Sequence, residues 1–169
     1  MIEVMVDLET MSTKSNAAIC SIGAVKFNSK TGEVVDTFYT TVDLATCKEV
    51  GLHVSKDTVQ WWSQQNKEAL RALTKNTIPL KLALEQFAEW LGGKSLPVWG
   101  NGAGFDNVVL DNAYAAIGVK RPWAYWHDRC YRTMKAIVDM PESPREGTYH
   151  NALDDAMHQT KHLLKILGS

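Results

Sequence analysis

The amino-acid sequence predicts an α/β fold with a mixed five-stranded sheet flanked by helices. Two features of the order of elements support this prediction. Three strand-like segments joined by short turns come first, as in an antiparallel meander. Strands and helices then alternate, an order that is typical of helices packed on a mixed sheet. With 169 residues, the chain is expected to form one domain, residues 1–169, with a core of its own.

The three strands of the meander are expected from composition and periodicity. Residues 2–8 alternate and are rich in Ile and Val, and residues 17–27 form a second apolar segment. Residues 33–43 follow a turn at residues 30–32 and form the third segment. Alternation and β-branched residues favour strands over helices in segments of this length.

Helical periodicity replaces alternation after the meander. Residues 55–65 open with Ser55 and are expected to form a short helix, and Asn66 is the expected N-cap of a second helix over residues 66–75. Residues 79–93 form the clearest amphipathic helix, which a Gly-Gly pair ends. Its apolar stripe consists of Leu80, Leu84, Phe87 and Leu91.

The second half of the chain continues this alternation of strands and helices. The expected order is a strand at 96–100, a helix at 105–118, a strand at 123–128, a helix at 129–139, a loop at 140–149 and a last helix at 151–167. The sequence shows no internal repeat and no low-complexity tract.

The composition is that of an ordinary globular protein, with 45% hydrophobic and 22% charged residues. The net charge of −1 argues against a protein that coats nucleic-acid phosphates passively. It does not argue against a nuclease, because metal ions supply positive charge at the phosphate. The three cysteines form no zinc or redox motif, and the sequence shows no signal peptide or membrane span. We therefore expect a cytoplasmic location without membrane partners.

Two carboxylates share one face of the first strand. Because strand side chains alternate, Asp7 and Glu9 project from the same side, roughly 6.6 Å apart at about 3.3 Å per residue. This spacing lets both acids reach one divalent ion or a close metal pair. A half-solvated strand with its acids in water explains the two residues equally well, and only the central position expected for this strand favours the metal site.

A third carboxylate follows a junction of strand, loop and helix. In the segment NGAGFD, Gly102 and Gly104 permit a sharp bend, and Asp106 falls in the first turn of the next helix. Ligands of open α/β sheets bind at this edge. Taken alone, Asp106 is better explained as an acid that the helix dipole favours.

The segment HNALDDA combines a histidine with two acids at the start of the last helix. At about 100° per residue, Asp155 lies at the edge of the apolar arc and Asp154 lies on the polar side. We expect Asp154 to face water as a capping partner of Asn151, and Asp155 to face the site. His150 precedes the N-cap, where an imidazole is suited to act as a general base, although an exposed loop histidine is the alternative.

Together these groups match what a two-metal phosphodiesterase requires. Such an enzyme needs acids that hold two divalent cations and a base that takes a proton from the attacking water. Oxygen ligands favour Mg²⁺ or Mn²⁺. Each group alone has a structural explanation, so the prediction depends on their occurrence together.

The segments VDLET, NGAGFD and HNALDDA resemble, in this order, the three motifs of the DEDDh family of 3′–5′ exonucleases. This family includes ribonuclease T, oligoribonuclease and the proofreading subunit of bacterial DNA polymerase III. The resemblance implies an RNase H-like fold, with Asp7, Glu9, Asp106 and Asp155 as ligands of two Mg²⁺ or Mn²⁺ ions and His150 as the general base. The compact length and the segment TVQWW are more similar to small bacterial or phage-type members related to ribonuclease T.

The reaction that the resemblance implies is hydrolysis of 3′-terminal phosphodiesters of single-stranded DNA or RNA, with release of nucleoside 5′-monophosphates. Met11 stands where family members often place an apolar residue that stacks on terminal bases, and Thr10 would lie near the 3′-terminal sugar. We expect Phe105 and Trp62, or its neighbour Trp61, to add stacking surfaces. Core packing is the alternative for Phe105 and for one of the two tryptophans.

Two rival functions are weighed against the exonuclease. A catalytically silent nucleic-acid-binding module would have lost a carboxylate or the histidine, and all five groups are present. An accessory proofreading domain of a larger complex is the second rival, whereas a sequence that ends in a helix favours a free-standing enzyme. The resemblance allows for a homodimer, since members related to ribonuclease T commonly pair. The sequence leaves DNA and RNA open as substrates.

Overall fold

The structure is a computed structural model that describes residues 1–168, so Ser169 of the predicted domain lies outside the described residues. Its sheet has the spatial order β3-β2-β1-β4-β5. The strands span Ile2–Thr10 (β1), Ile19–Asn28 (β2), Glu33–Thr41 (β3), Val98–Gly100 (β4) and Asp128–Cys130 (β5). β1, β2 and β3 pair antiparallel, while β4 runs parallel to both β1 and β5. The predicted meander and the mixed five-stranded sheet are confirmed.

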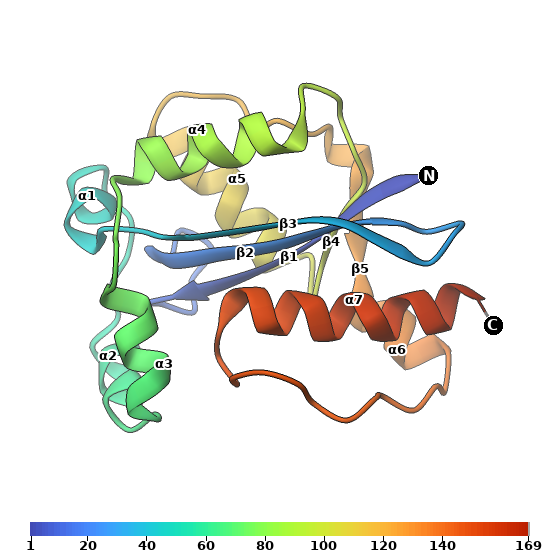
Figure 1. Ribbon diagram of the computed structural model, residues 1–169. Helices are drawn as coiled ribbons and strands as arrows, with labels where there is room; N and C mark the ends of the chain where they lie inside the picture. Colours follow the sequence, from blue (N-terminus) through green and yellow to red (C-terminus); the bar gives the residue numbers. More distant parts are fainter. Residues whose placement is uncertain (169) are drawn as a thin grey trace.

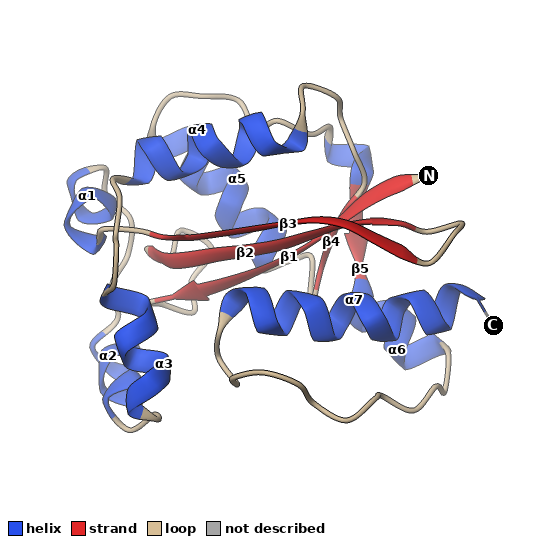
Figure 2. Cartoon of the chain, in the orientation of Figure 1, coloured by secondary structure: helices blue, strands red, loops and turns tan. Residues whose placement is uncertain are grey.

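Helices cover both faces of this sheet. In the described chain they span Leu44–Glu49 (α1), Lys56–Ser63 (α2), Lys67–Thr74 (α3), Leu80–Leu91 (α4), Asp106–Ala116 (α5), Tyr131–Ile137 (α6) and Ala152–Gly168 (α7). Figure 1 shows α4 and α5 over one face and α6 and α7 over the other, with α2 and α3 beyond one end of the sheet. Figure 2 shows the long loop that joins α6 to α7 on the outer side of α7. None of the helices within residues 1–168 has the length and apolar character needed to cross a membrane.

The alternation of β1 separates two apolar layers. Val4, Val6 and Leu8 join the core between the sheet and helices α4 and α5. Met5 lies on the opposite face and joins a second core with Leu163 of α7. Because strand side chains alternate, the odd-numbered acids of β1 share the face of Met5 and lie toward α7.

Capping residues explain where several helices begin and end. Ser55 accepts a hydrogen bond from the Thr58 amide in the first turn of α2, and Asn66, the predicted N-cap, accepts from the Glu68 and Ala69 amides in the first turn of α3. Gly92 takes a left-handed conformation, with φ of 90°, at the end of α4. The short helix α1 was not predicted. Asp43, which was expected in the third strand, caps α1 by accepting a hydrogen bond from the Ala45 amide.

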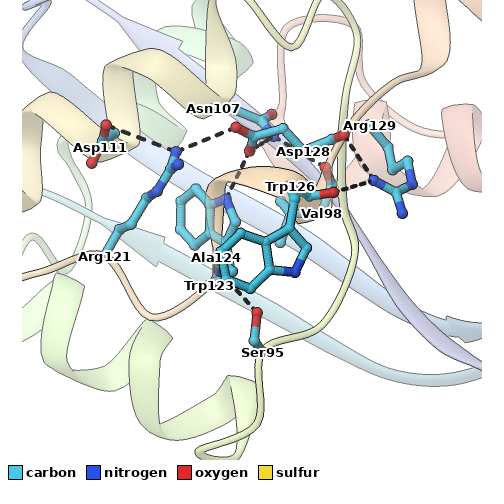
Figure 3. A network of polar contacts seen from close by, with 10 residues as sticks. All are labelled: Ser95, Val98, Asn107, Asp111, Arg121, Trp123, Ala124, Trp126, Asp128 and Arg129. Atoms are coloured by element: carbon cyan, nitrogen blue, oxygen red, sulfur yellow. Dashed lines mark hydrogen bonds and ion pairs between the residues drawn. The ribbon is translucent and has the colours of Figure 1, made fainter.

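The predicted strand at residues 123–128 is wrong in its position. A 3₁₀ helix spans Tyr125–His127, and β5 begins only at Asp128, so the following helix starts at Tyr131. The physical reason is visible in Figure 3, where the chain folds back on the Asp128 carboxylate. Trp123 Nε1 and Asn107 Nδ2 both donate to Asp128 Oδ1 at 2.8 Å. Trp123 is therefore buried as a packing residue, whereas Tyr125 and Trp126 lie in an exposed turn and do not alternate in a strand.

Candidate active site

The central strand brings two carboxylates to the face covered by α7. Asp7 and Glu9 are paired in register with Gly23 and Ser21 of β2, close to the carboxyl end of β1. One carboxylate oxygen each from Asp7, Glu9 and Asp155 lie within 4.8 Å of one another. The predicted pair on the first strand therefore meets the predicted acid of the last helix, although they are about 150 positions apart in the sequence.

The first turn of α7 sets the position of Asp155. The Asn151 side chain accepts a hydrogen bond from the Asp154 amide at 3.1 Å, and the Asn151 carbonyl accepts one from the Asp155 amide at 2.9 Å. One turn further along, Gln159 Nε2 donates to Asp7 Oδ1 at 3.0 Å. The Asn151 contacts fix the first turn of α7, and the Gln159–Asp7 contact joins α7 to β1.

Asp106, at the start of α5, lies next to these three carboxylates. It is the first residue of α5, is only 4% exposed, and accepts a hydrogen bond from the Leu8 amide at 3.2 Å. Gly102 makes the predicted bend before it, with φ of 90°. Among the described residues, the carboxylates within 4.8 Å of one another are those of Asp7, Glu9 and Asp155, and Asp106 lies next to them.

Burial and mutual repulsion favour the protonated forms of Asp7, Glu9 and Asp106. Burial raises the pKa of Asp7 well above its usual range, and the charges of Asp106 and Asp155 raise it further. Burial and the charge of Asp7 raise the pKa of Glu9 to about 10, and burial raises the pKa of Asp106 to about 7. The group becomes fully ionised at neutral pH only if positive charge is brought to it. Crowded carboxylate oxygens of this kind fit hard divalent cations such as Mg²⁺ or Mn²⁺.

His150 lies directly before the cap of α7 in a left-handed backbone conformation, with φ of 63°. This conformation is rare for a residue with a side chain and occurs preferentially at functional sites. The imidazole meets the Trp61 ring edge-on, with centroids 5.0 Å apart. It also lines a cavity of about 320 Å³ together with Asp7 and Asp155. The structure thus places the predicted base in the same cavity as two of the predicted metal ligands.

A second cavity of about 500 Å³ borders Glu9. Three of the predicted substrate-binding residues, Thr10, Phe105 and Trp62, line it. Trp62 is only 2% exposed, and its indole Nε1 donates to the Thr10 carbonyl at 3.0 Å. Trp61 lines the same cavity and is 42% exposed. Trp61 therefore offers the free aromatic surface, and Trp62 fixes α2 to the end of β1.

Met11, the fourth predicted substrate-binding residue, does not line this cavity. Its partly buried side chain packs against the apolar cluster of Cys20, Trp62, Ala69 and Leu73, which joins α2 and α3 to β2. The two residues that follow Met11, Ser12 and Thr13, line the cavity beside Glu9. In this structure Met11 therefore contributes to packing between α2, α3 and β2.

The expectation that Asp154 faces water is wrong. Its Oδ2 accepts a hydrogen bond from the Thr148 amide at 2.9 Å. A Cβ atom on Gly147 would lie 2.6 Å from its carboxyl carbon, so the loop passes directly over it. Asp154 therefore holds the loop before α7 in place while Asp155 faces the acids of β1.

Two residues of the site were not identified from the sequence. Gln159 lies four positions after Asp155, so helical spacing alone was sufficient to place both on one face. Arg145 forms an ion pair with Asp155 and lines the 320 Å³ cavity. It belongs to a loop without periodicity, and no sequence pattern indicates where its side chain goes.

The comparisons with known proteins agree with this geometry. A family model described as the 3′-5′ exoribonuclease Rv2179c-like domain matches residues 2–167. A comparison with curated protein sequences finds no match.

Several solved structures are similar in fold at low sequence identity. The nuclease domain of 3′hExo, a DEDDh family member bound to rAMP, has a TM-score of 0.68 at 15% identity, covering 99% of this chain and 92% of that chain. Cell-death related nuclease 4 (CRN-4) has a TM-score of 0.57 at 15% identity, covering 99% and 64%. E. coli exonuclease I in complex with a dT13 oligonucleotide has a TM-score of 0.66 at 15% identity, and there the chain covers 40% of the larger protein. The predicted RNase H-like fold is confirmed.

Proposed function

The chain belongs to the family of 3′-5′ exoribonuclease Rv2179c-like domains, and we propose that this DEDDh-type 3′–5′ exonuclease removes nucleotides from the 3′ ends of single-stranded RNA. The proposed products are nucleoside 5′-monophosphates, and the proposed cofactors are two Mg²⁺ or Mn²⁺ ions. The observation that carries the proposal is the grouping of Asp7, Glu9 and Asp155 within 4.8 Å, beside the cavity that His150 lines.

Two observations favour RNA as the first substrate to test. The matched family is described as exoribonucleases, and one similar structure holds rAMP. In addition, the cavity beside Glu9 is lined by several hydroxyl side chains, the kind of group that hydrogen-bonds a ribose 2′-hydroxyl. They belong to Thr10, Ser12, Thr13, Ser55 and Thr58. DNA stays in the test as the second substrate, because a similar structure was solved with dT13.

The proposed metal ligands are Asp7, Glu9, Asp106 and Asp155. The donor set fits divalent cations because it is composed of crowded carboxylates, and burial raises the pKa of Asp7, Glu9 and Asp106. When bound, such cations supply stabilisation of the charge that develops on phosphate oxygens. The protein's part is to hold the four carboxylates in place through the cap of α7 and the Leu8 amide.

His150 is the proposed general base. A ring nitrogen of its imidazole accepts the proton of the attacking water as the bond from water oxygen to phosphorus forms and the bond to the 3′-oxygen breaks. The left-handed backbone at His150 and the edge-on contact with Trp61 orient the ring toward the cavity shared with Asp7 and Asp155. The shared cavity supports this role, because the attacking water is proposed to lie in it, beside Asp7 and Asp155.

The terminal nucleotide is proposed to occupy the 500 Å³ cavity. Trp61 and Phe105 provide apolar surfaces on which the terminal bases stack, an interaction worth roughly 1–3 kcal/mol per base. Because Glu9 lines this cavity and also belongs to the carboxylate group, a nucleotide bound there has its phosphate beside the acids.

The experiment that tests the proposal is digestion of matched 5′-labelled RNA and DNA oligonucleotides with single-stranded 3′ tails, with Mg²⁺ or Mn²⁺ and with EDTA. The Asp7→Ala variant is the control for contaminating nuclease. We expect a ladder that shortens from the 3′ end, depends on the metal, is absent in the variant and is stronger on RNA. Intact RNA with every metal would contradict the proposed function, and faster digestion of DNA would contradict the proposed substrate.

A further inference from the structure

A long loop of residues 138–151 carries both His150 and Arg145 into the site. In Figure 1 it runs along α7 from the end of α6 to the start of α7. Side chains of α7 fasten it along its length. His158 hydrogen-bonds Glu142, Lys165 donates to Ser143, and Lys161 donates to Glu146. Asp154 accepts a hydrogen bond from the Thr148 amide. The loop is therefore fixed at its periphery, while Arg145 turns inward.

Arg145 has an acid, an aromatic ring and a backbone carbonyl as partners of its guanidinium. The acid is Asp155, with which it forms an ion pair in the 320 Å³ cavity, and the ring is that of Tyr149, whose centroid lies 4.4 Å from Cζ. The Nη2 group also donates to the Thr148 carbonyl at 3.0 Å. The Nε atom is buried, and no hydrogen-bond partner for it occurs in residues 1–168. A buried donor without a partner is costly, and a ligand that accepts from this atom would remove that cost.

The ion pair and the proposed function make competing demands on Asp155. Asp155 is a proposed ligand of a divalent cation, and its Oδ1 is taken by the guanidinium. A cation bound at Asp155 repels the positive guanidinium beside it, so both cannot keep their full interaction with one carboxylate. The Tyr149 ring gives Arg145 a position that does not depend on Asp155.

We propose that Arg145 is a substrate-phosphate ligand that neutralises Asp155 only while the metal site is empty. When divalent cations take Asp155, the guanidinium leaves that carboxylate, keeps its contact with Tyr149 and donates to the phosphate of the bound RNA 3′ end. This inference rests on the proposed function, because it takes Asp155 as a metal ligand and a phosphodiester as the substrate.

The charges of the site agree with this exchange. Two divalent cations balance the four ionised carboxylates, so Arg145 adds the single positive charge that a phosphodiester with one negative charge requires. The planar guanidinium suits this contact because its N–H groups match the geometry of phosphate oxygens. Its unpartnered Nε then gains an acceptor.

The first test is calorimetric titration of the protein with Mn²⁺, without substrate. The variants are Arg145→Met, which keeps an unbranched apolar stem and removes the charge, and Lys161→Met, which breaks the pair between Lys161 of α7 and Glu146 of the same loop, outside the carboxylate group. Because binding couplings are reciprocal, removal of the competing cation should tighten Mn²⁺ binding by about 5-fold or more in Arg145→Met. Lys161→Met should bind Mn²⁺ as the unchanged protein does.

The second test measures RNA binding with Mn²⁺ present, in a His150→Ala background that slows cleavage. Fluorescence anisotropy of a labelled single-stranded RNA should show binding weakened roughly 10- to 100-fold by Arg145→Met, the range for a lost hydrogen bond to a charged group. Arg145→Lys keeps the charge and should recover part of the affinity. Lys161→Met should leave it unchanged.

The two affinities must change in opposite directions. If Arg145→Met binds Mn²⁺ equally well or more weakly, or binds RNA as tightly as its background, the proposed role of Arg145 is wrong and the ion pair only holds the loop. If the unchanged protein binds no Mn²⁺ and digests no RNA, the proposed function fails, and this inference fails with it. Arg145→Lys guards against misfolding, since a melting temperature close to that of the unchanged protein shows an intact loop.

Discussion

Gly23 of β2 lies against the backbone of Ala152, the first residue of α7. A Cβ atom on Gly23 would lie 2.2 Å from the Ala152 carbonyl carbon and 2.3 Å from the Leu153 amide nitrogen. Both contacts are with backbone, which cannot rotate away as a flexible side chain can. Gly23 is paired with Asp7 in the sheet. The missing side chain therefore lets α7 start close enough to the sheet for Asp155 to meet Asp7.

The Gly23→Ala substitution should thus damage both stability and activity. We expect a loss of about 1–3 kcal/mol of unfolding free energy, the usual cost of overpacking, because the start of α7 must move outward. Activity should fall further than stability explains, since Asp155 moves with the helix. Gly168→Ala, at the open end of the same helix, is the matched control and should change neither. Urea denaturation and initial digestion rates measure the two effects.

His150→Ala should separate metal binding from catalysis. If the imidazole is the base, the turnover number falls roughly 10²- to 10⁴-fold while the affinity for Mn²⁺ stays the same. His127, which directly precedes β5 and hydrogen-bonds Ser95, provides the control. His127→Ala should retain full activity. Equal rates for His150→Ala and the unchanged protein would show that another group takes the proton.

The two neighbouring tryptophans should respond in different ways. Trp61→Ala removes an exposed stacking surface and should raise KM for RNA about 10-fold with little effect on the melting temperature. Trp62→Ala removes a buried anchor and should cost about 3–5 kcal/mol of stability. Met11→Ala should lower stability and leave KM unchanged, because Met11 packs against the cluster around Trp62 and does not line the cavity. A KM for Trp61→Ala equal to that of the unchanged protein would exclude stacking on Trp61.

Without metal, the protein should lose stability as the pH rises. Burial raises the pKa of Asp106 to about 7, so between the ordinary carboxyl range and about pH 7 this acid is protonated in the folded chain and ionised in the unfolded chain. Each rise in pH through that window therefore favours unfolding, and Glu9 extends the loss toward about pH 10.

Thermal melts in EDTA at about pH 5 and about pH 8 measure this dependence. The melting temperature should be lower at the higher pH, and added Mn²⁺ should raise it more at the higher pH than at the lower one. Asp106→Asn should show a smaller difference between the two values. Identical melting temperatures at both pH values would mean that the acids are not held protonated.

Local patterns predicted most elements and the grouping of the acids. Alternation on β1 placed Asp7 and Glu9 on one face, and helical spacing separated Asp155 from Asp154. Capping residues such as Asn66 marked helix starts because they act on neighbouring amides. These signals depend only on residues that are close in the sequence.

The contacts that decide the details are long-range, and the sequence alone did not show them. The turn at residues 123–128 is set by the Asp128 carboxylate, which collects donors from Trp123 and from Asn107 of α5. Arg145 reaches Asp155 from an irregular loop whose path depends on contacts with α7. Which of Trp61 and Trp62 is exposed depended on how α2 docks against Thr10, which periodicity in a helix of eight residues does not fix.

The most direct measurement is calorimetric titration of Mn²⁺ into the unchanged protein and into Glu9→Gln at neutral pH. Glu9 belongs to the three-carboxylate group and lines the proposed nucleotide cavity, and Gln keeps the shape of the side chain while removing its charge. We expect the unchanged protein to bind Mn²⁺ with release of protons from the buried acids, and Glu9→Gln to bind at least about 10-fold more weakly. Equal Mn²⁺ binding by both proteins would contradict the assignment of these carboxylates as the metal centre.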